Sequence, residues 1–541
     1  MNRQVARGPF ADFAITGARI RTFDTRRPQA SAVAWRDGTI IAVGSDAEIK
    51  EVCDAGTQAV DGRGTVLVPG LVDAHFHPLL GAGDTHGAVD LMSCETLDAV
   101  CAALAEHKQV GDGEWVLGYG LRYSVFPGGH IDGALIEDAT GGAPAFVTLY
   151  DFHSAVATSR ALALAGVTGP VPLPGTSQVV IRDGRLTGEL LEGPAMELVR
   201  SVIPTPTAQE RRDFLIGLLR SWNAMGLTAL HVMDGTAATF ETLRDLEGTN
   251  DLTLRMVVAL TVTPDMDGES RDAVLRLCGE RGSLWRGGAA KFFMDGTVEA
   301  GTAWLFEPDV NGEGTLPYWP DPQEYRKATA QFAAAGFQCV THAIGDRAVR
   351  EALDAYRDAG HADGVMHRIE HIETVRDEEV RRFAPEQVVA SMQPVHVDAT
   401  FDDPDPVWPA RLGPERAARA WRYGDLLRSG AVLALGSDWP VAWADPRRGM
   451  ASARLRRTPG RPDAPVICPE QALTPEQALA GYTSGPARVA GEADQAGQIS
   501  VGYRADLTGF VDDPLAVDPD TLLSLPVAMT IVAGRIAYEN R

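Results

Sequence analysis

Eight apolar runs alternate with helical stretches through the middle of the chain. The runs cover residues 66–75, 227–233, 254–262, 289–295, 337–342, 366–371, 388–396 and 432–438. Helical stretches lie between most of them, including 209–225, 323–335, 347–359 and 421–429. This alternation predicts a parallel sheet wrapped by helices, an α/β fold. Eight units predict a closed (β/α)8 TIM-like barrel, whose active site lies at the carboxyl ends of the strands.

Both ends of the chain have a different pattern, with short strands separated by turns. These strands are expected at 12–20, 30–35, 39–43, 505–511, 528–533 and 536–538. We therefore expect a small composite β-sandwich domain from residues 1–68 and 500–541, and a barrel domain over 69–499.

The segment from about 79 to 206 breaks the barrel rhythm and is predicted to be an insertion after the first barrel strand. It contains two more strand-like runs, 115–119 and 145–153. Counting the second run as a barrel strand would give nine strands, so the strand register is open at this point.

The net charge and the cysteine pattern limit the partners and the compartment. A formal net charge of −24 disfavours binding to nucleic acid or to anionic membranes and leaves a small molecule as the expected partner. No stretch reaches the roughly 18 apolar residues of a membrane helix. The six scattered cysteines form no CxxC pair, which disfavours a thiolate zinc site and favours the cytoplasm.

Polar residues that suit metal ions stand at the ends of several predicted strands. His75 and His77 are two residues apart, so they share one face of a strand. His342, His371 and Asp438 end three further runs. Taken singly, the histidines could be solvated or core side chains, and Asp438 could cap a helix. Together, at the end of a barrel where enzymes work, they predict a metal site.

Lys291 lies inside the apolar run 289–295, where a charged amine is costly unless it is paired or neutral. The chain has only four lysines among its 49 basic residues, so a buried lysine stands out. An amine can lose its proton when buried, which arginine cannot do. A neutral lysine can add carbon dioxide and become an anionic carbamate that bridges two metals. The alternative is an ion pair with Asp295 or another buried acid.

The ordered motifs resemble the amidohydrolase superfamily, in particular its amidohydrolase-3 branch of YtcJ-like proteins and N-substituted formamide deformylases. The matching segments are 69–77 (PGLVDAHFH), 291–296 (KFFMDG), 341–346 (THAIGD), 368–371 (RIEH), 436–438 (GSD), 37–44 (DGTIIAVG) and 502–507 (GYRADL). The resemblance extends over nearly the whole chain.

The resemblance implies a binuclear centre with two divalent metal ions, expected to be zinc. His75 and His77 would hold the more buried ion, and His342 and His371 the second. Carboxylated Lys291 would bridge both ions. Asp438 would contact the first ion and act as the catalytic proton carrier. The resemblance also implies a homodimer.

The implied reaction is hydrolysis of a C–N bond, an amide or formamide, through a metal-bridged hydroxide. An esterase or lactonase keeps the same residues and stays open. A ring deaminase is disfavoured because such relatives usually lack the bridging lysine. A catalytically inactive barrel used for binding is disfavoured by the intact ligand set. Five further residues are expected to contact the substrate: Tyr119, His153, His231, His396 and Trp439.

Overall fold

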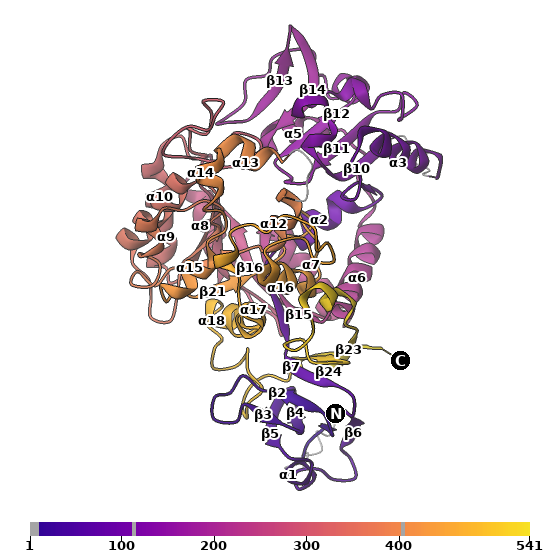
Figure 1. The fold of residues 1–541 in the computed structure, drawn as a ribbon, viewed down its shortest axis with the longest axis vertical. Coiled ribbons are helices and arrows are strands. Elements are labelled where there is room, and N and C mark those ends of the chain that lie inside the picture. The colour runs from indigo at the N-terminus through magenta and orange to yellow at the C-terminus, as the bar shows by residue number, and fades with distance from the viewer. Residues whose placement is uncertain (1–9, 111–114, 402–405, 541) are drawn as a thin grey trace.

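The computed structural model describes residues 10–110, 115–401 and 406–540, which form three regions stacked along the long axis of the molecule (Figure 1). A β sandwich lies at one end, an eight-stranded barrel in the middle and a separate sheet at the other end. No helix in the described part of the chain is both long and apolar enough to cross a membrane.

The barrel is a parallel sheet of eight strands in the order β21-β20-β19-β18-β17-β16-β15-β8. Backbone hydrogen bonds complete the ring beyond β21, since the Asp438 amide donates to the His75 carbonyl at 2.8 Å and the His77 amide to the Trp439 carbonyl at 3.0 Å. The eight predicted core strands are therefore confirmed as a barrel. Their bounds are β8 (Leu71–Phe76), β15 (Leu227–Gly235), β16 (Arg255–Thr261), β17 (Trp285–Phe293), β18 (Gln338–Ala343), β19 (Arg368–His371), β20 (Val389–Met392) and β21 (Leu433–Leu435).

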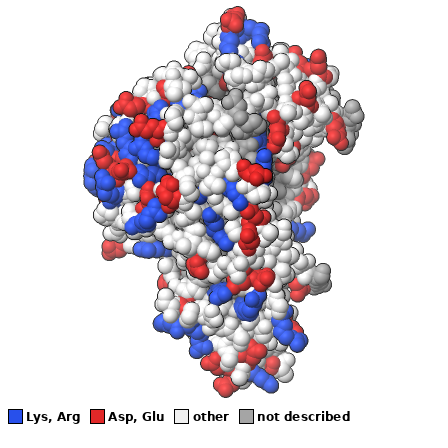
Figure 2. Space-filling model, in the orientation of Figure 1, with Lys and Arg blue, Asp and Glu red and all other residues white. Residues whose placement is uncertain are grey.

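The helices around the barrel begin and end where local sequence signals place them. Helix α6 (Ala208–Ala224) starts with a capping box, in which Thr207 and Glu210 satisfy each other's backbone amides. Helix α10 (Asp346–Ala359) ends at Gly360, which has a φ of 65°. On α10 and neighbouring α9 (Pro322–Ala334), arginines pair with acids, as in Arg326–Glu351 and Arg357–Asp354. Charges of both signs accordingly interleave on this flank (Figure 2).

The two chain ends meet in the β sandwich. One sheet has the order β5-β4-β1-β6, and the other has the order β24-β23-β22-β7-β2-β3. Their shared core includes Ile15, Trp35, Leu67, Leu507 and Ile531, which come from both termini. The strand bounds are β1 (Phe13–Thr16), β2 (Arg19–Arg21), β3 (Gln29–Ala30), β4 (Ala32–Arg36), β5 (Thr39–Gly44), β6 (Gln58–Asp61), β7 (Val66–Pro69), β22 (Leu507–Phe510), β23 (Val527–Val532) and β24 (Arg535–Glu539).

The predicted strand 66–75 is divided at Gly70 into β7, which belongs to the sandwich, and β8, which belongs to the barrel. The Gly70 amide donates to the Asp506 carbonyl at 2.9 Å. A Cβ atom at Gly70 would lie 2.4 Å from the Thr228 hydroxyl, so this crossing needs a residue without a side chain. Apolar periodicity continues across the division, which is why the sequence pattern shows one strand.

The insertion forms its own sheet, in the order β13-β14-β12-β11-β10-β9, above the barrel mouth (Figure 1). The run at 145–153 therefore contributes β11 to this sheet and is no ninth barrel strand. The bounds are β9 (Val89–Asp90), β10 (Val116–Leu121), β11 (Ala145–Leu149), β12 (Ser154–Ala157), β13 (Gln178–Arg182) and β14 (Arg185–Leu191).

Candidate metal centre

Three side chains converge at the carboxyl end of β8. The Nε2 atoms of His75 and His77 are 3.3 Å apart, and Asp438 Oδ1 lies 3.3 Å from the first and 3.2 Å from the second. His75 and Asp438 are buried, and His77 is half-buried. The strand alternation that places both histidines on one face has therefore brought their metal-binding atoms to one point.

His342 and His371 extend this cluster from the ends of β18 and β19. The rings of His371 and His342 have centroids 4.4 Å apart, and the His371 ring is 4.8 Å from that of His75. Donor atoms of His75, His371 and Asp438 all lie within 4.8 Å of one another. Lys291, described next, joins these five residues. All six residues named from the sequence as ligands therefore lie in one largely buried group.

The Nζ atom of Lys291 is 3.4 Å from His75 Nε2, and the residue is fully buried in β17. No ion pair of Lys291 is present among the described residues, and Asp295 is not its partner. The Asp295 carboxylate instead accepts the amides of Trp304, Ile344 and Gly345 at 2.8–3.0 Å. Burial lowers the pKa of Lys291 to about 8, so about a tenth of the amine is unprotonated at pH 7.

The electrostatics of the cluster suit a cation. Burial lowers the pKa values of His75, His342 and His371, so these imidazoles stay neutral and keep a lone pair for a metal ion. Burial alone would raise the pKa of Asp438, but nearby His75, His77 and His371 hold it well below its usual range.

Three buried polar atoms in the cluster, His77 Nδ1, His371 Nδ1 and Asp438 Oδ1, have no hydrogen-bond partner. Such atoms are costly in a protein interior unless a ligand satisfies them. Neutral imidazoles, a carboxylate and an amine that can be carboxylated form a donor set that fits divalent metal ions.

The backbone is strained at two of these positions. His371 has a φ of 72° and Asp438 a φ of 63°, values that non-glycine residues rarely adopt. Each conformation costs about 1–3 kcal/mol and persists only where the surroundings enforce it. Both residues end barrel strands, and this backbone geometry turns their side chains towards the cluster.

Two carboxylates beneath the cluster were not singled out in the sequence. Glu370 Oε2 lies 2.5 Å from His75 Nδ1, which leaves His75 Nε2 facing the other ligands. Asp73 accepts the backbone amides of His75 and Ser437 at 3.0–3.1 Å and so ties β8 to the segment before Asp438. A carboxylate that orients a ligand histidine is a common supporting contact in metal sites. The sequence contains a signal for both residues, since each is an acidic residue inside an apolar run, Asp73 in 66–75 and Glu370 in 366–371.

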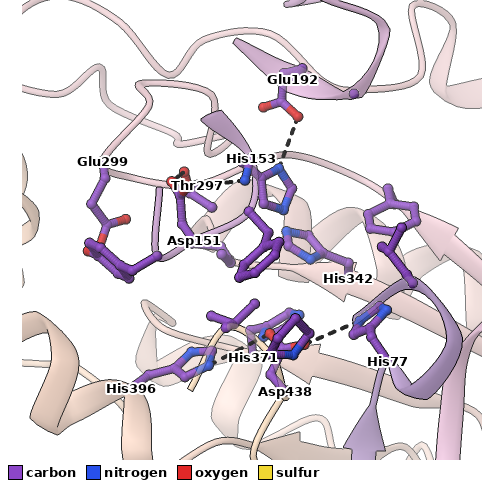
Figure 3. A pocket seen from close by; sticks show the side chains of 18 of the residues that line it. His77, Asp151, His153, Glu192, Thr297, Glu299, His342, His371, His396 and Asp438 are labelled. Carbon is purple, nitrogen blue, oxygen red and sulfur yellow. Dashed lines mark hydrogen bonds and ion pairs between the residues drawn. The ribbon is translucent and has the colours of Figure 1, made fainter. Parts of the chain in front are cut away.

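A cavity of about 250 Å³ opens above the cluster, between the barrel mouth and the insertion (Figure 3). His153 and His396, two of the expected substrate contacts, lie in its wall. His153 Nδ1 is 2.9 Å from Glu192 Oε2. Burial alone would lower the pKa of His153, but the Glu192 carboxylate outweighs it and raises that pKa to about 9. His396 lies on α12 (Val395–Phe401), beyond the end of β20, and is 3.7 Å from both Glu373 and Asp438.

Three of the residues expected to contact the substrate do not line the cavity. Tyr119 is in β10 of the insertion sheet, where it pairs with Asp90 of β9. Trp439 stacks on Phe76 at 5.3 Å behind the ligand strand. His231 points into the barrel interior below the cluster, where its Nδ1 is 3.0 Å from Arg368 Nη1. Each residue lies near the end of a strand predicted from the sequence, but none lines the cavity, and His231 lies in the middle of β15.

The cavity wall also contains acids that the sequence did not distinguish from surface residues. They are Asp151, Glu192, Glu299 and Glu373. Glu192 has a φ of 64°, and Glu299 accepts a hydrogen bond from Tyr150 at 2.5 Å. Burial raises the pKa of Glu299 to about 8. Their burial depends on how the insertion folds over the barrel, which no local pattern encodes.

A family model described as "Amidohydrolase family" matches residues 58–538. The chain belongs to the amidohydrolase family. It is 31% identical to Protein LONG AFTER FAR-RED 3 of Arabidopsis thaliana, over 98% of this chain and 92% of that protein. It is 27% identical to putative amidohydrolase YtcJ of Bacillus subtilis (97% and 99% covered). It is 28% identical to N-substituted formamide deformylase of Arthrobacter pascens (98% of each covered). The amidohydrolase-3 resemblance is therefore confirmed.

Solved structures support the same fold. An uncharacterized metal-dependent hydrolase from Pyrococcus horikoshii OT3 superposes with a TM-score of 0.74 at 24% identity, over 94% of this chain and 99% of that one. Atrazine chlorohydrolase TrzN from Arthrobacter aurescens TC1, solved with zinc, superposes with a TM-score of 0.55 at 16% identity (98% and 95% covered). These structures support the TIM-like barrel, and membership of the amidohydrolase family supports a metal-dependent hydrolase.

Proposed function

We propose that the protein hydrolyses a C–N bond, an amide or formamide, in a small molecule, with two divalent ions held by His75, His77, Lys291, His342, His371 and Asp438. The observation that carries the proposal is Lys291, a buried amine without an ion pair, 3.4 Å from His75 Nε2. Its charge also acts on His342 and His371, so it lies close to both histidine pairs. A carboxylated Lys291 would supply the anionic bridge that two cations need.

Zinc is the ion we infer, because imidazole and carboxylate donors suit it and a structural neighbour contains it. Bound divalent ions would lower the pKa of a water molecule and polarise a carbonyl oxygen. Asp438 stays ionised beside His75 and His77, so it can accept the proton of the attacking water. The same carboxyl group can then return that proton to the departing nitrogen.

The insertion closes the cavity over this centre and would limit access of bulk water. His153 lines the cavity from the insertion, next to Glu192, and His396 lines it from the barrel, next to Asp438 (Figure 3). Both can hydrogen-bond a substrate held above the centre. The substrate side chain would contact the wall that includes Phe152, Tyr318 and Glu299.

The family resemblance further supports a homodimer. The six cysteines, all free thiols in the structure, support a cytoplasmic location. Light scattering on the purified protein would test the first inference, and fractionation of the source cells would test the second.

The test is amine release from a panel of N-substituted formamides, N-acyl amino acids and cyclic amides, with chelator-treated protein as the blank. Aryl esters and lactones serve as the comparison set. Metal-dependent amine release from one amide class would support the proposal. Cleavage of esters alone would show that the same centre acts on C–O bonds. Protein that binds no divalent ion would contradict the proposal altogether.

A further inference from the structure

A fully buried arginine lies directly beneath the candidate metal centre. Arg368 begins β19, is 1% exposed, and points into the barrel interior. Its Nε and Nη2 atoms donate to the two carboxylate oxygens of Glu370. Nη2 also donates to the Ala74 carbonyl and, at 2.8 Å, to the Ser391 hydroxyl. Nη1 lies 3.0 Å from His231 Nδ1.

These contacts continue to a metal ligand. Glu370 Oε2, which accepts from Arg368 at 2.8 Å, also lies 2.5 Å from His75 Nδ1. A guanidinium has no acceptor, so His231 Nδ1 must be the acceptor in its contact with Arg368. Arg368 therefore donates to both His231 and Glu370, and Glu370 also accepts from His75 Nδ1, so the four residues form one connected chain of hydrogen bonds.

The physical consequence is a fixed orientation of His75. A guanidinium keeps its charge even when buried, so it requires an ionised partner, and its planar fork matches a carboxylate in one plane. Glu370 is therefore held as a carboxylate in a set plane. Its oxygen accepts the Nδ1 proton of His75, which leaves the Nε2 lone pair facing His77, Asp438 and Lys291.

We propose that Arg368 is a positioning residue that sets the metal affinity of the centre by fixing Glu370 and, through it, the tautomer and ring orientation of His75. This inference rests on the metal-binding part of the proposed function. His231 and Ser391 hold the far side of the guanidinium, which assigns His231 a role beneath the centre and outside the substrate cavity.

The chain offers a matched control. Arg456 is equally buried, but its guanidinium donates to the backbone carbonyls of Ala420, Trp421 and Ile467 and lies over the ring of Tyr423. Arg368→Met and Arg456→Met both remove a buried guanidinium, and only the first removes a contact to a carboxylate that orients a ligand. A general loss of packing would affect the two variants alike.

The first measurement is the zinc dissociation constant of metal-free protein, by competition with a chromophoric chelator. We expect Arg368→Met to bind zinc about 10–100-fold more weakly, as for other contacts that orient metal ligands. Arg368→Lys keeps the charge and loses the planar fork of the guanidinium. Its zinc affinity should lie between those of the wild type and Arg368→Met. Arg456→Met should keep the wild-type zinc affinity whatever its melting temperature. Wild-type affinity in Arg368→Met, or equal weakening in Arg456→Met, would overturn the proposal.

Two milder variants at His231 keep the proposal testable if Arg368→Met does not fold. His231→Gln keeps an acceptor for Nη1, and His231→Leu removes it. We expect wild-type zinc affinity in the first and about threefold weaker binding in the second, the effect of one hydrogen bond. Equal affinities in the two variants would contradict the role given to His231.

A second readout needs neither metal nor activity. Nitrogen-15 shifts of labelled histidine in metal-free protein report the tautomer, and the His75 signals are assigned by their absence in His75→Gln. We expect one Nδ1–H tautomer in the wild type and a mixture in Arg368→Met. An unchanged tautomer would overturn the inference. If the wild type binds no zinc but Arg368→Met still changes the His75 tautomer, the proposed function and the effect on metal affinity both fail, and the positioning of His75 by Arg368 stands.

Discussion

The two walls of the cavity differ in their chemistry. The barrel wall presents the metal cluster, in which burial lowers the pKa values of His75, His342 and His371 and the Asp438 carboxylate stays ionised. The insertion wall presents a paired imidazole and carboxylate, His153 and Glu192, in which the histidine pKa is raised to about 9. One wall therefore keeps lone pairs for cations, whereas the other carries an ion pair suited to polar groups of a substrate. Metal content and substrate preference should respond separately to changes in the two walls.

The largest effect is expected from Lys291→Ala in the barrel wall, which tests whether metal content depends on that wall. We expect the variant to lose bound metal and about 10³-fold or more of its activity, because it lacks the bridging anion. Metal analysis and rate measurements test this, with short carboxylic acids added to look for rescue. Lys327→Ala is the control, since Lys327 is exposed and pairs only with Glu324. Full metal content in Lys291→Ala would refute the bridging role.

The corresponding change in the insertion wall is Glu192→Ala. Losing the hydrogen bond to His153 should lower kcat/KM by about 10–100-fold, the effect of a bond to a charged group, while metal content stays at the wild-type level. Glu189→Ala is a nearby control, because Glu189 pairs with Arg182 and does not line the cavity. If Glu192→Ala also loses its metals, the two walls are not independent.

The smallest expected effect is the pH dependence of metal uptake. Carboxylation requires the neutral amine of Lys291, whose pKa in the metal-free protein is about 8. The neutral fraction rises about tenfold per pH unit below that value and levels off above it. Reconstitution of metal-free protein with zinc, at constant dissolved carbon dioxide, should therefore speed up about eightfold between pH 6.5 and 7.5. A rate that falls with pH at constant dissolved carbon dioxide would argue against carboxylation.

The sequence predicted the barrel and the ligand group because both depend on local patterns. Strand alternation places His75 and His77 on one face, and parallel strands bring His342 and His371 to the same edge. Glu370 and Arg368 could not be assigned in this way. All four residues of β19 are buried, so alternation does not separate those that line the metal centre from those beneath it.

Other features depend on tertiary packing and could not be predicted from sequence patterns. The positive φ values arise at the barrel mouth, for His371 at the end of β19 and for Asp438 just after β21, and neither residue type requires them. Tyr119, His231 and Trp439 were expected in the cavity because they stand near strand ends. Which side of the insertion sheet faces the barrel, and how deep a side chain lies in the barrel, follow only from the assembled fold.

The division of one strand at Gly70 ties the far end of the chain to the metal centre. β22 of the C-terminal segment pairs with β7, and β7 leads directly into the strand that carries His75. Trimming the last 35 residues would remove β22 and release the anchor of that ligand strand. Proteolytic nicks, affinity tags and gene fusions at the C-terminus should therefore be checked by metal stoichiometry, since damage there would appear as a poorly loaded enzyme.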